Sequence, residues 1–288
     1  MTLTELHAQA LAGHWAVPHF NFSSLAQANG IIDAVVAARA PVVLGLSEGE
    51  RDFVGLAQAV YLAKSFEDTQ GIPVFLNADH TKSVERAKEA VDAGFSSIHI
   101  DLSKEPYDKN LAGVKEVVAY AKDKNSDINV EGELGYFATE SSKRYTEAVE
   151  IPEDSFTKPE EAATFVQETG VDRFAPAVGT LHGIAANKPV LRFDLIEAIR
   201  KIVPDEVALV LHGGSGVADE DIKKAVEMGF NNIHVSTELR VAYSDALRKT
   251  LQEKPNEVAP YHYLKEARAA VAAVTRQKLD LFNTVNVV

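Results

Sequence analysis

The 288-residue sequence contains no cysteine. Disulfide bonds, thiolate metal sites and a cysteine nucleophile are therefore excluded, and a transition metal would have to be bound by His, Asp or Glu. The sequence also lacks an apolar run of about 18 residues, the length that a membrane-spanning helix needs. Its first residues, MTLTELHAQALAGHW, lack the basic segment and following apolar segment of a secretory signal. We therefore expect a soluble cytoplasmic protein.

Basic residues are scarce. The 29 Lys and Arg stand against 42 Asp and Glu, which gives a net charge of −13. A nucleic-acid partner requires a basic patch that neutralises phosphates, and the sequence has no Lys/Arg cluster. We expect neither nucleic acid nor a membrane as a partner, and the acidity favours solubility. Linkers rich in Pro, Gly or Ser are also missing, so we expect one domain over residues 1–288.

What the sequence does contain is a regular alternation of short apolar runs with longer amphipathic segments. Residues 80–100 and 215–235 share the pattern K-x-A-V-x-x-G-F-x-x-I-H, with the apolar spacing of a helix followed by Gly and a strand. The predicted strands are 17–22, 41–47, 73–79, 97–103, 128–134, 174–179, 207–212 and 232–237. Eight such units favour an α/β fold, a single (β/α)8 TIM barrel, over a doubly wound open sheet. Residues 2–12 and 259–282 are predicted as extra terminal helices.

One segment interrupts this rhythm. Residues 135–158 form a long polar stretch between the fifth strand and a helix that starts near Pro159. Loops of this length in a compact barrel are usually lids or binding loops. We expect an active-site lid, with a disordered insertion as the alternative.

Polar residues follow several predicted strands, at the end of a barrel where active sites form. Glu131 and Glu133 are two residues apart and therefore share one face of the fifth strand. The others are Asp79 and His80 at the end of strand three, Asp101 at the end of strand four, His182 after strand six and His212 at the end of strand seven.

Three of these residues are histidines and could together bind a metal ion. A catalytic zinc takes three protein ligands and keeps one position open, and His80, His182 and His212 fit that count. Asp101 or Glu133 could be an extra ligand, a residue that hydrogen-bonds to a ligand, or part of a second metal site. The alternative for each histidine is a hydrogen-bonded structural residue. His19, His99 and His234 also lie on strands; we expect them in the barrel interior, and the alternative is that His99 and His234 extend the polar site.

Glycine-rich loops follow two strands. HGGSG (212–216) and HG (182–183) come directly after the seventh and sixth strands. Glycine lets backbone amides approach an anion closely, and barrels often bind phosphate after strands seven and eight. Ser215 and Thr237 could add hydroxyl donors. The alternative is a tight turn.

Taken together, these segments resemble the metal-dependent class II aldolases, the ketose-bisphosphate family that includes fructose- and tagatose-bisphosphate aldolases. The resemblance covers nearly the whole chain and keeps its order. It runs through FNFSSLAQANGIIDA, APVVLGLSEG, DH, GFSSIHIDLS, VEGELG, TKPEEAATFVQETGVD, AVGTLHG, LVLHGGSG and STEL to YLKEARAAV.

The resemblance implies a reaction and its cofactors. A ketose 1,6-bisphosphate would be cleaved reversibly to dihydroxyacetone phosphate and glyceraldehyde 3-phosphate, as in glycolysis. Fructose 1,6-bisphosphate is the first choice of substrate and tagatose 1,6-bisphosphate the second. The family uses Zn²⁺, with a second divalent position and a monovalent cation, and its members are homodimers or homotetramers.

It also implies roles for individual residues. Asp79 would be the acid/base at the aldehyde oxygen. His80, His182 and His212 would bind zinc, with Asp101 and Glu133 at an alternate or second metal position. Glu140 is the nearest lid residue to the proton-transferring glutamate of the family, with Glu147 and Glu150 behind it. The dihydroxyacetone phosphate half would contact Ser47, Gly183, Gly213, Gly214, Ser215, His234, Ser236 and Thr237.

The sequence departs from the family pattern at three places. His234 replaces the usual Asn of the eighth strand. Ala185 and Ala186 replace a Tyr-Lys pair, and GYFATESSKRY replaces a GGxED-like run at the start of the lid. These departures leave a non-catalytic phospho-sugar-binding barrel as one alternative, and a metal-dependent hydrolase is the other. A Schiff-base aldolase is disfavoured on chemical grounds, since none of the eight predicted strands contains Lys.

Overall fold

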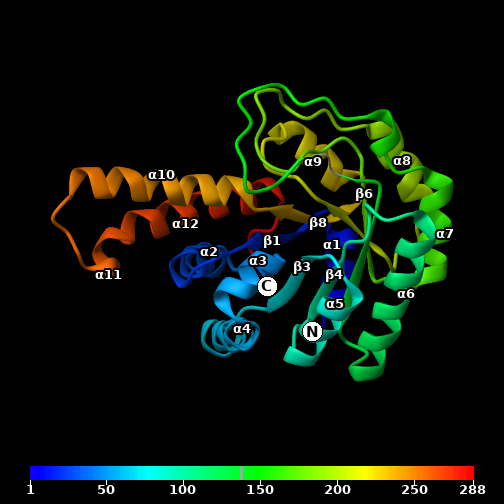
Figure 1. Cartoon of the computed structure of the whole chain (residues 1–288), viewed down its shortest axis with the longest axis horizontal. Coiled ribbons are helices and arrows are strands. Elements are labelled where there is room, and N and C mark those ends of the chain that lie inside the picture. The colour runs from blue at the N-terminus through cyan, green and yellow to red at the C-terminus, as the bar shows by residue number, and fades with distance from the viewer. Residues whose placement is uncertain (137–138) are drawn as a thin grey trace.

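The computed structural model describes residues 1–136 and 139–288, and its eight parallel strands close into a barrel in sequence order (Figure 1). The first strand pairs with both the second and the eighth, which excludes the open doubly wound sheet and confirms the (β/α)8 barrel. The strands are β1 Val17–Asn21, β2 Val42–Leu46, β3 Val74–Thr81, β4 Ser97–Ile100, β5 Asn129–Leu134, β6 Arg173–Pro176, β7 Ala208–Leu211 and β8 Phe230–Val235.

The helices surround this barrel and extend beyond it. They are α1 Leu3–Gly13, α2 Leu25–Ala38, α3 Glu48–Val54, α4 Leu56–Gln70, α5 Val84–Ala93, α6 Tyr107–Lys124, α7 Pro159–Thr169, α8 Phe193–Ile202, α9 Asp219–Glu227, α10 Thr237–Glu253, α11 Pro260–Tyr263 and α12 Lys265–Leu281, with a 3-10 turn, η1, at Glu153–Ser155. The helix predicted for 259–282 is divided between α11 and α12. None of the described helices combines the length and the apolar character needed to cross a bilayer.

The repeated pattern of the sequence corresponds to two equivalent βα units. Helix α5 buries Ala87, Ala90 and Val91. Helix α9 buries the three residues at the equivalent positions, Ile222, Ala225 and Val226. Both helices present the i, i+3, i+4 stripe that an amphipathic helix turns toward the core. Each unit then leads into a strand whose last residue but one is a buried histidine, at 99 in β4 and 234 in β8.

Helices α10 to α12 form a hairpin that projects from the barrel (Figure 1). Helix α12 returns along α10 and packs on α2, which attaches the hairpin to the barrel wall. The chain then ends beside α2, where the Asn286 amide donates to the Ala38 carbonyl at 2.8 Å.

The described part of the predicted lid is hydrogen-bonded to the loop after β6. The Tyr145 amide donates to the Ile184 carbonyl at 2.8 Å, and the Asn187 side chain accepts from the Val149 amide at 2.8 Å. Both bonds join the segment to a loop at the C-terminal end of the barrel strands. Residues 137 and 138 lie outside the described residues, and the role of a lid stays a prediction.

Candidate active site

Three imidazoles meet at the C-terminal mouth of the barrel. His80 lies near the end of β3, His182 lies on the loop after β6, and His212 directly follows β7. Their ring centroids are separated by 4.8 Å (His80–His182), 4.7 Å (His80–His212) and 6.0 Å (His182–His212). The rings of the three residues that the sequence singled out as zinc ligands therefore lie in one cluster. Among the described residues, however, His182 belongs to none of the groups whose possible ligand atoms all lie within 4.8 Å of one another.

A break in the regularity of β3 lets Asp79 and His80 face the site together. Neighbouring residues on a strand normally point to opposite faces. Here the register with β4 shifts between Ala78 and Thr81, and His80 has φ = 44°. A left-handed conformation at a non-glycine residue costs roughly 1–2 kcal/mol and is typical of functional sites. The buried Arg51 guanidinium supports the irregularity by donating to the Asp79 carbonyl at 3.3 Å.

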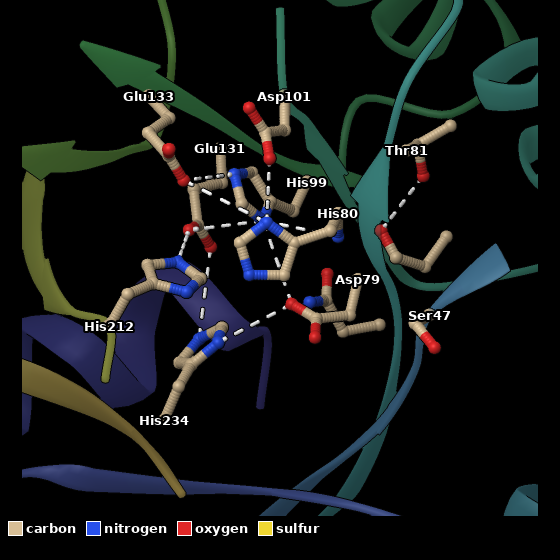
Figure 2. A network of polar contacts seen from close by, with 12 residues as sticks. Ser47, Asp79, His80, Thr81, His99, Asp101, Glu131, Glu133, His212 and His234 are labelled. Atoms are coloured by element: carbon tan, nitrogen blue, oxygen red, sulfur yellow. Dashed lines mark hydrogen bonds and ion pairs between the residues drawn. The ribbon is translucent and has the colours of Figure 1, made fainter. Parts of the chain in front are cut away.

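His80 is oriented by acidic partners on β5 and just after β4 (Figure 2). Its Nδ1 lies 2.7 Å from Asp101 Oδ2 and 3.8 Å from Glu133 Oε2. Asp101 also contacts the Lys82 ammonium. The two acidic residues predicted at an extra or second metal position thus lie around His80, with Asp101 as its hydrogen-bond partner. His99 lies beside them, with Nε2 at 3.3 Å from Glu133 Oε2 and Nδ1 accepting from the His80 amide at 3.2 Å.

Asp79 has one hydrogen-bond donor and two imidazoles beside it. Its Oδ2 accepts a hydrogen bond from Asn21 Nδ2 at 3.0 Å, and its Oδ1 lies 3.5 Å from Nδ1 of both His99 and His234. Burial alone would raise the pKa of Asp79, but the neighbouring His80 and the close approach of His234 and His99 hold that pKa well below its usual range. Asp79 is therefore held as an ionised carboxylate.

His234 forms one wall of the cavity. Its ring stacks on His19 with a centroid distance of 3.5 Å and an interplanar angle of 2°. Burial, followed by the charges of His19 and His212, lowers the pKa of His234 well below its usual value, so the ring is neutral. Both His99 and His234 are buried in the barrel as expected, and their contacts with Asp79 also support the alternative that they extend the polar site.

The glycine loops lie beside these side chains. Gly183 and Gly213 have φ = 86° and φ = 65°, and a Cβ there would lie 2.7 Å from the Glu140 carbonyl oxygen and 2.4 Å from the Leu181 carbonyl oxygen. Only glycine fits such positions. The Gly214 amide, in contrast, donates to the His234 carbonyl at 3.2 Å, so it faces the barrel rather than the cavity. The cavity is lined by Asn21, Asp79, His80, Ser141, His182, Gly183, His212, Gly213, Ser215, His234, Ser236 and Thr237.

Five residues of the predicted set do not line this cavity: Asp101, Glu133 and Gly214, which are described above, and Ser47 and Glu140. Ser47 precedes α3, and its hydroxyl bonds to Glu50 Oε2 at 3.0 Å. Glu140 is exposed and forms an ion pair with Lys143 at 3.1 Å. Both border a neighbouring depression that also includes His80. A catalytic contact by Glu140 would require its carboxylate to turn away from Lys143.

Sequence reasoning missed two residues that organise the site. Asn21 ends β1, so the same strand-end rule that identified Asp79 could have found it. Arg173 begins β6 and is fully buried, with Nη2 at 3.1 Å from Glu131 Oε2. A single Arg at the edge of an apolar run carries no such signal, because it is normally exposed.

The donor set fits a divalent cation. Imidazole nitrogens and carboxylate oxygens suit zinc and similar metals. Asp79, His80, His99 and His212 each offer a ligand atom within 4.8 Å of the others, and so do His80, His99, Asp101 and Glu133. Among the described residues, Asp79 Oδ1 and Glu133 Oε2 are buried without a hydrogen-bond donor. A cation would balance this buried negative charge.

Comparisons with known proteins agree with this geometry. Residues 1–287 match the family model described as fructose-bisphosphate aldolase class-II. A fructose-bisphosphate aldolase of Geobacillus stearothermophilus is 33% identical over 99% of this chain and 97% of that protein. The D-tagatose-1,6-bisphosphate aldolase subunit GatY of Klebsiella oxytoca is 34% identical over 96% of this chain and 94% of its own length. The crystal structure of the YdjI aldolase of Escherichia coli K12 superimposes with a TM-score of 0.83 at 30% identity, covering 99% of this chain and 97% of that one.

Proposed function

The chain belongs to the class II fructose-bisphosphate aldolase family, and from that premise we propose that it cleaves a ketose 1,6-bisphosphate reversibly to dihydroxyacetone phosphate and glyceraldehyde 3-phosphate. The observation that carries the proposal is the convergence of three imidazoles beside the ionised carboxylate of Asp79. The hydrolase and non-catalytic alternatives are not favoured, because the relatives are named aldolases over nearly their whole length.

The family is metal-dependent, and we assign the cation to His80, His182 and His212. Neutral imidazoles leave the charge of a divalent metal uncancelled. Zinc held there would supply a Lewis acid for the negative charge that develops on the ketone oxygen during cleavage. Asp101 and Glu133 would orient His80 or share a second divalent position, since both approach its Nδ1.

Asp79 handles the proton of the cleavage step. When the C3–C4 bond breaks, the C4 hydroxyl becomes the aldehyde and its proton passes to an Asp79 oxygen. In the condensation direction the proton returns from Asp79 to the same oxygen. Asn21 fixes Asp79 Oδ2 at 3.0 Å, which leaves Oδ1 as the oxygen that exchanges the proton.

The glycine loops hold the dihydroxyacetone phosphate half. We assign the phosphate to the backbone at Gly183 and Gly213 and to the hydroxyls of Ser215, Ser236 and Thr237, all of which line the cavity. The neutral His234 ring offers a hydrogen bond to the carbonyl end of the same half. Holding the phosphate fixes the reacting carbon against the catalytic side chains.

The lid would supply the proton that the dihydroxyacetone carbon receives. Among the lid glutamates, Glu140 borders the depression that includes His80 and is our candidate. Fructose 1,6-bisphosphate is the proposed substrate. Tagatose 1,6-bisphosphate is the second, because the Klebsiella relative is as similar as the Geobacillus one.

A coupled assay for triose phosphate release tests the proposal. Zinc-loaded protein is given fructose or tagatose 1,6-bisphosphate, with the Asp79→Asn variant as control. We expect release from at least one substrate by the wild type and its loss in the variant. A zinc-loaded protein that releases no triose phosphate from either substrate would overturn the aldolase proposal.

A further inference from the structure

The Arg173 side chain is a fully buried cation. Its Nη1 donates to Asn232 Oδ1 at 2.9 Å. Its Nη2 donates to Asn77 Oδ1 at 3.1 Å and to Ser97 Oγ at 2.5 Å, and lies 3.1 Å from Glu131 Oε2. These partners come from β8, β3, β4 and β5, so the guanidinium lies inside the barrel and is held from several sides.

Glu131 connects this guanidinium to a proposed metal ligand. While Oε2 faces Arg173, Oε1 lies 2.6 Å from His212 Nε2 (Figure 2 shows the Glu131–His212 contact). Both side chains of the Glu131–Arg173 pair are fully buried. Glu131 therefore has one oxygen on a rigid cation and the other on His212.

This arrangement selects one tautomer of His212. An ionised carboxylate only accepts hydrogen bonds, so His212 Nε2 must carry the proton. In the neutral ring Nδ1 then carries the lone pair, which is the electron pair that a metal requires. Carboxylates that bond the second nitrogen of a ligating histidine orient the ring in this way in many metal sites.

We propose that Arg173 is a positioning residue for the metal centre, which holds Glu131 so that Glu131 keeps His212 in the Nε2–H tautomer. This inference rests on the proposed role of His212 as a ligand. Arg173 is not among the residues that line the cavity, so it acts on the site through Glu131. A lysine at this position could keep the charge, but a single ammonium cannot span Asn232 and Glu131 as the planar guanidinium does.

Zinc affinity of the metal-free protein, measured by competition with a chromophoric chelator, tests the proposal. We expect Arg173→Met to weaken zinc binding by about 10- to 100-fold and Arg173→Lys to fall between Met and the wild type. Asn129→Ala is the matched control, because Asn129 is also fully buried on β5 but bonds to Thr4. It should lower the melting temperature and leave zinc affinity within about twofold of wild type.

A second measurement needs no stable Arg173→Met protein. Nitrogen-15 imidazole shifts of the wild type, with His212 identified from a His212→Gln spectrum, should show protonated Nε2 and unprotonated Nδ1. The opposite tautomer, or Arg173 variants that bind zinc like the wild type despite a lower melting temperature, would overturn the proposal. Wild-type protein that binds no zinc at all would instead overturn the proposed function.

Discussion

The two faces of the barrel wall have opposite chemistry. On β5, Val130 and Leu134 face outward into the apolar layer beneath the helices. Gly132 also faces outward, because a Cβ there would lie 2.9 Å from the Phe165 ring. Between them, Glu131 and Glu133 point inward, where they meet His212 and His99. The outer face stabilises the fold by burying apolar surface, while the inner face carries the charged side chains of the candidate active site.

This difference explains how one strand serves two purposes. Burying apolar side chains is favourable by about 25 cal/mol per Å². Burying charges is favourable only when partners surround them. The two faces should therefore respond differently to mutation. Substitutions on the outer face should lower the unfolding free energy, and substitutions on the inner face should lower zinc affinity and turnover.

Loss of a proposed ligand should have the largest effect on the inner face. His212→Ala removes an imidazole and leaves Glu131 Oε1 without its partner. We expect zinc affinity to fall by more than about 100-fold, which exceeds the effect of losing a residue that only hydrogen-bonds to a ligand. Turnover should be lost as well. Metal analysis after gel filtration measures this, and retention of a full equivalent of zinc would contradict the assignment of His212.

Asp79→Ala should separate the chemistry from the metal. The variant loses the group that accepts the C4 hydroxyl proton, and general acid–base catalysis typically contributes about 10²–10⁴-fold. We expect turnover to fall in that range with zinc content unchanged. If the zinc content of Asp79→Ala fell as far as that of His212→Ala, Asp79 would be a ligand or a structural residue instead.

Phe174→Ala tests the outer face. Phe174 is fully buried on β6 beside Arg173, and its ring lies 5.9 Å from that of Phe165. We expect about 3–5 kcal/mol of lost unfolding free energy from the cavity. Zinc affinity of the folded fraction should stay unchanged. Urea denaturation gives the first quantity and chelator competition the second. A loss of zinc affinity comparable to that of Arg173→Met would show that the two faces are not independent.

Metal removal should destabilise the protein moderately. A ligand at about 100 times its Kd adds about 2.7 kcal/mol to the unfolding free energy. We expect a chelator to lower the melting temperature of the wild type and to leave that of His212→Ala unchanged. Equal shifts in both proteins would indicate that the chelator acts elsewhere than on these histidines.

The smallest effect concerns acid stability. Burial raises the pKa of Asp101, but His80, His99 and Lys82 together hold it well below the usual value of 3.8. A carboxyl whose pKa is depressed on folding stabilises the protein above its unfolded pKa, and that contribution is lost as the pH falls through the folded pKa. The metal-free wild type should therefore lose stability more steeply than Asp101→Asn as the pH falls below about 4. Urea denaturation of both proteins at pH 5.5 and 3.5 measures this loss of unfolding free energy. An equal loss in the wild type and in Asp101→Asn would argue against the stabilising role of Asp101.

Periodicity made the outer face predictable. Ala87, Ala90 and Val91 are spaced as a helix requires, and the alternation on β5 placed Glu131 and Glu133 on one face in advance. The strand-end rule also found the histidines that meet at the barrel mouth. These features depend on local spacing, which a sequence displays directly.

Contacts between distant segments were not predictable. The left-handed backbone at His80 depends on a register shift against β4 and on the buried Arg51 of α3. Burial of Arg173 depends on partners from four other strands. No local pattern encodes such partners, because they come together only when the barrel closes.

X-ray absorption at the zinc K-edge tests the central claim most directly. The zinc-loaded wild type should show three imidazole nitrogens at about 2.0–2.1 Å. Each of His80→Ala, His182→Ala and His212→Ala should either bind no zinc or show one imidazole fewer. An unchanged imidazole count in a zinc-loaded variant of any of the three would contradict a cation shared by all of them.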